Sequence, residues 1–302
     1  MRARGFGDAC SEFALRIASS LPIGPAPFFP AAPDPARLPA RSGRLSLEIV
    51  SHCWRYSHLL RHQLASLADD PPHELDLRVT VFHSAEDADT VALLERFGQR
   101  DVPGVAWNWR CIDTPRLLRR SIGRNLAARD TTADWIWFTD CDVIFNAESL
   151  DALAAQLQGR RDVLVYPSTE RVTPMLPDEA LHAGGNGPES GPAVNEMPFY
   201  EKPISRATGP VQITHGDVAR EWGYCNAVSV YQQPTDRWRK TYDDRSFRWL
   251  LGTQGIALPV SGFRRIRHVT KGRYHGNPLA TALRSRIRRV RSWWHERRRD
   301  TH

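Results

Sequence analysis

The chain has 302 residues, of which 41 are Lys or Arg and 34 are Asp or Glu, so its formal net charge is +7. With 41% hydrophobic and 25% charged residues, the composition is that of a globular protein and excludes a disordered chain or a coiled coil. The length accommodates one large α/β domain or two small ones. No run of about 18 apolar residues occurs, which argues against a membrane-spanning helix. The five cysteines are scattered, which indicates a reducing cytoplasm without structural disulfides.

The predicted elements begin after a leader. The first 43 residues are rich in proline, which disfavours helix and sheet, so we expect an extended or weakly ordered segment. Beyond it, the apolar pattern alternates between the period of a strand and that of a helix. Strands are predicted at 45–51, 75–83, 105–109 and 135–139, and helices at 56–67, 91–97 and 115–128. This alternation predicts an α/β fold with a mostly parallel central sheet flanked by helices.

The second half of the chain is less regular. Residues 173–209 are dominated by Pro, Gly, Asn and Glu, which predicts a long loop of the kind that is usually functional. A strand at 211–214, a short helix at 247–251 and a strand at 256–260 follow. Residues 279–294 carry an apolar stripe with arginines elsewhere, which predicts a final amphipathic helix.

Positive charge is concentrated near the C-terminus. Between Arg264 and Arg299 there are 13 Lys and Arg and one acid, which gives +12 and leaves −5 for the rest of the chain. A basic amphipathic helix suits an anionic membrane surface, whereas nucleic acid is a weaker interpretation. A solvated helix that packs one face on the domain is the remaining alternative.

Two aspartates follow the most apolar of the predicted strands. Asp140 and Asp142 come directly after Trp135-Ile136-Trp137-Phe138-Thr139, and the carboxyl ends of strands face the ligand crevice in an open α/β sheet. Two carboxylates there can hold a divalent cation that grips a diphosphate. The spacing alone is a weak signal, because Asp87-Ala88-Asp89 repeats it without an apolar strand directly before it.

The Arg-Asn-x-Ala-Ala pattern at Arg124, followed by an apolar strand and Asp-x-Asp, resembles the GT-A glycosyltransferases, family 2 in particular. The resemblance implies a GT-A domain over residues 44–276, between the leader at 1–43 and a basic helical tail at 277–302. It also implies an inverting transfer of a hexosyl group from a nucleoside diphosphate sugar to an acceptor hydroxyl. Mn²⁺ or Mg²⁺ would bridge the diphosphate, and the pathway would be assembly of a bacterial surface polysaccharide or glycolipid.

The same resemblance assigns roles to residues. Arg124 and Asn125 would lie beneath the donor, and Asp140 would face the sugar or ribose and join Asp142 at the metal. Asp243 and Asp244 are similar to the family's Glu-Asp segment, in which the second acid is the general base. The alternative for these two residues is an N-cap, since Asp commonly caps helices.

The C-terminal Arg-His segment is similar to that of β-1,4-galactosyltransferase-like enzymes. It points to His268 as the last metal ligand, with His275 as the competitor, and an imidazole ligand favours manganese. Lys271 and Arg273 would neutralise phosphates.

The turns that would hold the donor base depart from the family pattern. His83-Ser84 stands where the family has an acid, so the contact would shift to Glu86 or Asp87, and Ser51 would contribute through its backbone. On the acceptor side the candidates are Gln212, Trp222 and Tyr224, because polar groups and aromatic faces bind sugar rings.

Two other functions stay open at this point. The unusual turn at His83-Ser84 and the replacement of Glu by Asp243 favour a non-catalytic scaffold that binds sugar nucleotide or membrane. A sugar-phosphate nucleotidyltransferase is the second alternative, although the first strand has no Gly-rich signature. The expected partners are a nucleotide-sugar donor and a carbohydrate or lipid-linked acceptor. The expected location is the cytoplasm, with peripheral attachment to the inner face of the cell membrane as a further option.

Overall fold

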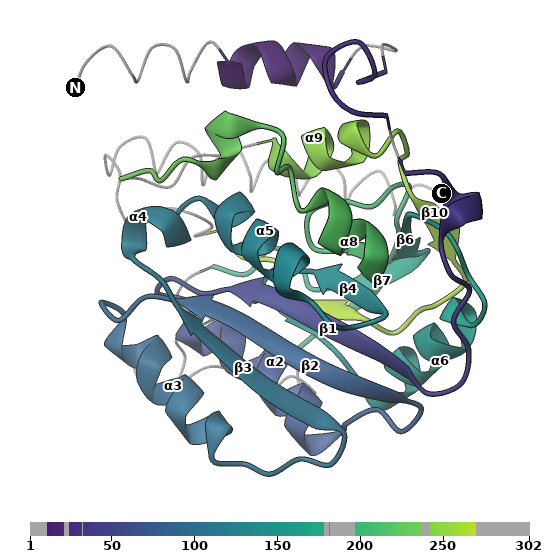
Figure 1. Cartoon of the computed structure of the whole chain (residues 1–302). Helices are drawn as coiled ribbons and strands as arrows, with labels where there is room; N and C mark the ends of the chain where they lie inside the picture. Colours follow the sequence, from purple (N-terminus) through teal and green to yellow (C-terminus); the bar gives the residue numbers. More distant parts are fainter. Residues whose placement is uncertain are drawn as a thin grey trace, which may run out of the picture.

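The computed structural model describes residues 11–20, 24–31, 33–177, 181, 197–236 and 242–269 (Figure 1). Within these residues a seven-stranded sheet forms the centre of the molecule. In spatial order its strands are β10 (Ile256–Leu258), β6 (Leu164–Pro167), β9 (Gln212–His215), β4 (Trp135–Phe138), β1 (Leu45–His52), β2 (Leu75–His83) and β3 (Val105–Cys111). Neighbouring strands run parallel except at β9, which is antiparallel to both β4 and β6. The predicted mostly parallel sheet is confirmed.

Helices cover both faces of this sheet (Figure 1). On one face lie α2 (Ser57–Asp69), α3 (Ala88–Gly98) and α6 (Ala147–Leu157). On the other lie α4 (Thr114–Leu117), α5 (Arg120–Asp130) and α8 (Gly216–Trp222). Because β4 is covered on both sides, its side chains are apolar in succession rather than alternating, and six of the eight side chains of β1 are buried as well. Trp135 and Trp137 of β4 are among the largest fully buried side chains.

Two predicted helices differ from those observed. The single helix predicted at 115–128 is divided into α4 and α5, because Arg119 leaves the helical conformation with φ −102° and ψ 81°. The helix predicted at 247–251 is α9 (Asp243–Leu250), so both acids before it lie within its first turn. Local periodicity did not reveal this earlier start.

A second, smaller sheet joins the chain after β4 to the C-terminal part. It consists of β5 (Val143–Ile144), β11 (Arg264–Arg265), β7 (Thr169–Val172) and β8 (Tyr200–Pro203). An ion pair fastens it, in which Arg265 donates to both carboxylate oxygens of Glu170 at 2.7 and 2.8 Å. This sheet places the segment after β11 beside the Asp-x-Asp turn.

The ends of the chain are described only in part. Residues 11–18 of the leader are helical, and the 3-10 helix η1 (Pro35–Arg37) follows. The tail helix predicted at 279–294 lies outside the described residues, so the three-part division of the chain stays a prediction. In the part of the chain that the structure describes, none of the helices has the length and hydrophobicity needed to span a bilayer.

Candidate functional site

The predicted site lies where the parallel strands end. β1, β2, β3 and β4 run in one direction, so the loops after them share one edge of the sheet. The amide of Gln63, on α2, donates to the carbonyl oxygens of Asp140 and Val143, each at 3.0 Å. Its own side-chain carbonyl accepts a 2.5 Å hydrogen bond from the Ser51 hydroxyl. The Ser51 side chain is therefore buried and supports the Asp-x-Asp turn, and the predicted contact of its backbone with the donor stays a prediction.

Asp140 lies against two arginine side chains of α5. Its Oδ1 atom accepts a 2.5 Å hydrogen bond from Arg120 Nη1 and is 3.5 Å from Arg124 Nη2. The Asp140 carboxylate raises the pKa of Arg120 and outweighs the opposite effect of burial. The sequence motifs did not identify Arg120. Its place one helical turn before Arg124 is the signal that could have done so, since residues four apart share a helix face.

Arg124 is fully buried and is not part of a surface ion pair. Its Nη1 donates to the Tyr224 hydroxyl at 2.8 Å, and its Nη2 donates to the carbonyl oxygens of Gly209 at 2.9 Å and Thr139 at 3.3 Å. The Tyr224 hydroxyl donates in turn to Gln212 Oε1 at 2.8 Å. A buried network of this kind rigidifies its surroundings, although the Nε of Arg124 has no hydrogen-bond partner. It ties the end of β4, just before Asp140, to the loop around residue 209.

The residues predicted to bind the acceptor lie inside the protein. Tyr224 and Gln212 are both 0% exposed, and the Tyr224 ring stacks on Phe247 with centroids 4.3 Å apart. Gln212 Nε2 donates to the backbone carbonyl of Asp244 at 3.1 Å. Trp222 is half-buried against the same core. Tyr224 and Gln212 therefore support the first turn of α9 from beneath, and their burial does not fit the predicted contact with a sugar ring.

Asn125 has a supporting place as well. Its Oδ1 accepts from the backbone N–H of Tyr224 at 2.9 Å, and its amide donates to Asn226 at 3.1 Å and to Gln232 at 3.2 Å. The same loop contains Cys225 with a φ of +52°, a left-handed conformation that costs energy in a non-glycine residue. Asn125 thus holds a strained loop next to α9, and its predicted place beneath the donor stays a prediction.

Asp142 and His268 face each other. His268 Nε2 is 3.8 Å from Asp142 Oδ2, and the two side chains are 3% and 5% exposed, respectively. The pairing of β5 with β11 creates this contact, and Ile266 continues it by donating its backbone N–H to the Asp142 carbonyl at 2.9 Å. The ring of Tyr56 packs edge-on against His268 with centroids 5.3 Å apart. Asp142 and His268, two of the predicted metal ligands, thus lie together, whereas among the described residues no group of three or more His, Cys, Asp or Glu could hold a metal ion.

The two acids of α9 differ in exposure. Asp243 is 1% exposed, whereas the Asp244 side chain is 30% exposed and its Oδ2 is 3.4 Å from Arg248 Nη1. The N-cap of α9 is Tyr242, so neither aspartate is the N-cap and that alternative is wrong. Asp244 lies beside the loop at Gly209, where a Cβ would sit 3.8 Å from that of Asp244.

Of the two acids after β2 that were predicted to contact the donor base, one has a structural role. Asp87 is buried and caps α3, because its Oδ1 accepts from the backbone N–H of Thr90 at 3.4 Å. Its Oδ2 accepts from the backbone N–H of Arg55 at 2.5 Å and from the Thr90 hydroxyl at 2.7 Å. Glu86 is exposed and remains the candidate for a donor contact. Burial lowers the pKa of His83, so this imidazole is neutral at pH 7.

His52 is a second residue that the sequence patterns missed. It ends β1, and its ring stacks on Phe82 with centroids 5.0 Å apart. Burial, followed by the charges of Arg124 and Arg120, lowers its pKa well below the usual value. Gly123 faces the ring from α5, and a Cβ there would come within 2.1 Å of His52 Nε2. A neutral ring therefore fills the space between the end of β1 and the start of α5.

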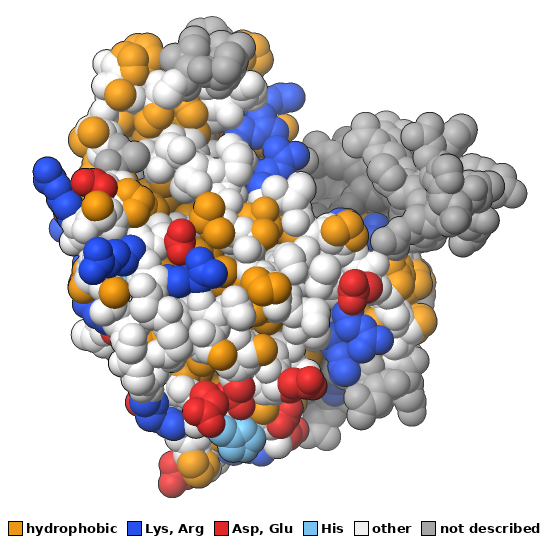
Figure 2. All heavy atoms as spheres, turned by 90° about the vertical axis from the view of Figure 1, so that its right-hand side faces the viewer, with side chains coloured by type: hydrophobic (Ala, Val, Ile, Leu, Met, Phe, Trp, Pro, Cys, Tyr) orange, Lys and Arg blue, Asp and Glu red, His pale blue; other side chains and the backbone are white. Residues whose placement is uncertain are grey.

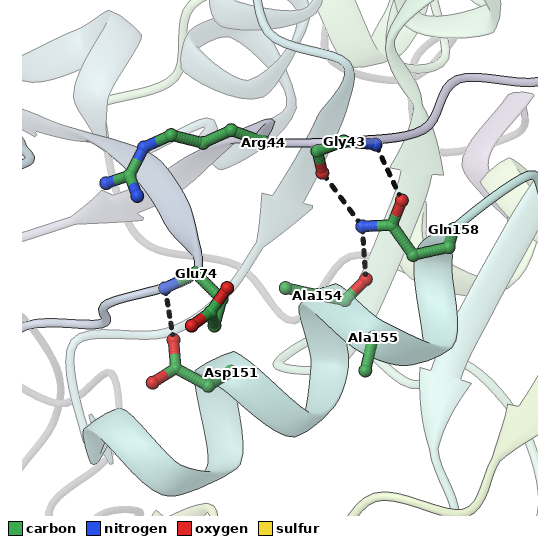
Figure 3. Close-up of a pocket in the computed structure, with 7 residues that line it drawn as sticks. All are labelled: Gly43, Arg44, Glu74, Asp151, Ala154, Ala155 and Gln158. Carbon is green, nitrogen blue, oxygen red and sulfur yellow. Dashed lines mark hydrogen bonds between the residues drawn. The ribbon is translucent and has the colours of Figure 1, made fainter.

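Lys271, Arg273 and His275 lie outside the described residues, and their predicted roles stay predictions. A hollow elsewhere on the molecule is bounded by Gly43, Arg44, Glu74, Asp151, Ala154, Ala155 and Gln158 (Figure 3). It lies at the amino ends of β1 and β2, opposite the edge that carries the site. Its polar groups are used by the fold, since Asp151 accepts from the N–H of Glu74 and Gln158 bonds to both backbone groups of Gly43.

Comparisons with known proteins show what this chain is similar to. Residues 49–218 match the family described as glycosyl transferase family 2. A search of curated protein sequences found no match. Among solved structures, residues 1–349 of TarS from S. aureus in complex with UDP-GlcNAc are similar at 14% identity and a TM-score of 0.46, over 78% of this chain and 61% of that one. The mannosyltransferase PcManGT from Pyrobaculum calidifontis in complex with GDP-Man and Mn²⁺ is similar at 16% identity and a TM-score of 0.43, over 90% of this chain and 68% of that one. The chain thus spans about three fifths of the TarS structure that it matches.

Proposed function

The chain belongs to glycosyl transferase family 2, and on that basis we propose that it transfers a sugar from a nucleoside diphosphate sugar to an acceptor hydroxyl with inversion. The observation that carries the proposal is the contact of Asp142 with His268, next to the ion pair of Arg120 with Asp140. A carboxylate and an imidazole suited to a metal thus lie near a cation at the carboxyl edge of a parallel sheet. A diphosphate requires both kinds of group.

The paired residues fit Mn²⁺ or Mg²⁺. Asp142 and His268, whose side chains are 5% and 3% exposed, would supply two ligands, and oxygens of the donor diphosphate would complete the coordination. The imidazole favours manganese. When bound, the ion would stabilise the negative charge that develops on the departing diphosphate.

The protein's own residues would orient and neutralise the donor. Arg120 fixes the Asp140 carboxylate and brings a positive charge to the end of β4, which supports a role for Asp140 at the sugar or ribose. Arg124 supports the site from within the protein, because its own side chain is 0% exposed. The exposed Glu86 is our candidate for the donor base.

We assign the general base to Asp244. An acceptor hydroxyl can reach a carboxylate that is 30% exposed, whereas Asp243 is buried and interacts with the charges of Arg120 and Arg124. Positioned acid–base catalysis contributes about 10²- to 10⁴-fold in rate. We therefore expect Asp244→Asn to lower kcat by about that factor while donor binding is kept. Glu221→Gln, an exposed substitution at the end of α8, is the control. If Asp243→Asn lowered kcat by this factor and Asp244→Asn did not lower it, the general base would be Asp243 instead.

The donor is found by thermal unfolding with UDP, GDP, CMP and dTDP sugars, each with Mn²⁺ or with EDTA. A ligand at about 100 times its Kd stabilises the fold by roughly 2.7 kcal/mol. We expect a manganese-dependent rise in Tm with one nucleotide, lost in Asp142→Ala and kept in Asp89→Ala. Asp89 is a matched control because it is the second acid of the other Asp-x-Asp and lies exposed on α3.

The outcomes separate the functions considered. Manganese-dependent transfer or hydrolysis of the donor supports the transferase. Nucleotide binding without turnover supports a scaffold, and release of pyrophosphate from a nucleoside triphosphate and a sugar phosphate supports a nucleotidyltransferase. A response that is the same in Asp142→Ala and wild type would contradict the metal assignment.

We place the acceptor in a carbohydrate or a lipid-linked sugar of the bacterial cell surface, with the protein in the cytoplasm and attached peripherally to the membrane. The charge of +12 between Arg264 and Arg299 supports attachment. Removal of anionic lipid from vesicles should weaken binding of the full chain if this tail contributes.

A further inference from the structure

The leader packs on the same side of the molecule as α9. Helical residues 11–18 turn one stripe inward, where Leu15 and Ala18 contact the main core and Glu12 lies 2.6 Å from Arg119 Nη1. The Ser20 hydroxyl accepts a 2.6 Å hydrogen bond from Arg245 of α9. The leader is thus attached to the domain through apolar contacts, an ion pair and a hydrogen bond.

The opposite face of this segment is apolar too. Phe13 is 60% exposed, Ile17 45% and Phe28 72%, and the fourth large hydrophobic side chain this exposed among the described residues is Ile256. Phe13 and Ile17 are four residues apart and so share the outer face of the helix. Figure 2 shows hydrophobic side chains at the upper end of the molecule, where the leader lies. Three exposed side chains of this size in one short segment mark an interaction surface.

The charge around this surface is positive. The guanidinium groups of Arg16 and Arg245 both lie over the Tyr242 ring, at 4.9 and 5.1 Å from its centroid. Glu12, the one acid in residues 11–31, is held by Arg119. Exposed aromatic and aliphatic side chains with arginines beside them complement the apolar boundary and anionic headgroups of a bilayer.

We propose that residues 11–20 and 24–30 form a membrane-docking surface, in which Phe13, Ile17 and Phe28 enter the headgroup boundary of an anionic bilayer. A second copy of the chain is a poorer occupant. With 60%, 45% and 72% of their surface exposed, these three side chains of about 200 Å² each present about 350 Å² per chain. Two copies would thus bury about 700 Å² in total, which falls short of the roughly 1,000 Å² that a stable interface buries. Docking through the leader turns the side of the molecule that carries α9 toward the bilayer. This inference does not depend on the proposed reaction.

The test is co-sedimentation of the full chain with vesicles of phosphatidylcholine, with or without phosphatidylglycerol. We expect wild type to bind the anionic vesicles and the triple variant Phe13→Ser, Ile17→Ser, Phe28→Ser to lose about tenfold or more in partition coefficient. Ile256→Ser is the matched control, because Ile256 is similarly exposed but lies on β10 at the edge of the sheet. All variants carry the same basic tail, so the difference between them reports the leader.

A second measurement guards against a folding defect in the triple variant. Hydrogen exchange of wild type with and without anionic vesicles should show added protection in residues 11–30 and none in α3. Equal vesicle binding by wild type and the triple variant, or no added protection in the leader, would overturn the proposal. Light scattering that shows a wild-type dimer and a monomeric triple variant would assign the surface to a second copy and overturn it as well. None of these readouts uses a sugar nucleotide, so failure of the proposed reaction leaves them unaffected.

Discussion

The Tyr224 hydroxyl links Arg124 to Gln212, and its removal gives the sharpest test of the buried network. In Tyr224→Phe, one N–H of the Arg124 guanidinium and the Gln212 side-chain oxygen each lose a partner at 2.8 Å, and both side chains are 0% exposed to bulk solvent. An unsatisfied buried polar group costs about 1–3 kcal/mol, and more when it is charged. The substitution should therefore lower the free energy of unfolding by about 3 kcal/mol.

Tyr231→Phe is the matched control. Tyr231 is also buried, but its hydroxyl has one neutral partner, the Ser246 hydroxyl at 3.2 Å. Its loss should cost about 1 kcal/mol. At roughly 2–4 °C per kcal/mol, the expected falls in Tm are about 6–12 °C for Tyr224→Phe and about 2–4 °C for Tyr231→Phe.

Differential scanning calorimetry of the two variants beside wild type decides the matter. Equal falls in Tm for the two variants would mean that the Arg124 guanidinium does not depend on the Tyr224 hydroxyl, and the reasoning about the network would then be wrong. Because Gln212 also bonds to the Asp244 carbonyl, the network predicts a fall in turnover of Tyr224→Phe at temperatures where it remains folded.

Three further predictions concern other contacts. Gly123→Ala should destabilise the fold by about 1–2 kcal/mol, because the new Cβ meets the buried His52 ring. Gly24→Ala is the control and should be neutral, because a Cβ there has no atom within 4 Å. Thermal unfolding measures both variants, and an unchanged Tm for Gly123→Ala would show that the ring moves aside. The pKa of His62 is lowered to about 4, chiefly by burial, so the unfolded state binds the proton more tightly and stability should fall as the pH drops from about 6.5 to 4. His62→Gln should flatten the dependence of Tm on pH in this range. An unaltered dependence would show that His62 is not the group responsible. Glu170→Gln leaves Arg265 without its carboxylate and should lower the free energy of unfolding by about 3–5 kcal/mol. It should also weaken manganese binding, because this ion pair fastens β11 and hence His268. Isothermal titration with Mn²⁺ measures this second effect, and an unchanged affinity would show that the ion pair does not support the metal site.

The central strands and the Asp-x-Asp motif were determined by sequence alone. Strand 135–139 is apolar on both faces, and strand 45–51 carries Leu45, Leu47 and Ile49 on one face. Short apolar runs of this kind between helical patterns have few alternatives to a buried parallel strand. Because strand direction then fixes which ends face the ligand, the place of Asp140 and Asp142 followed before any tertiary contact was known.

Tertiary structure decided which side chains meet. The proximity of His268 to Asp142 depends on the pairing of β5 with β11, about 120 residues apart in the chain, and no local period encodes such a register. Tyr224 and Gln212 looked like surface sugar contacts because a polar or aromatic residue near a strand end has no local mark of burial. Their place beneath α9 comes from Arg124, whose charge can be buried only where several carbonyl and hydroxyl oxygens surround it. Sequence periodicity reports the face of one element, whereas the partner on that face is set by the packing of the whole chain.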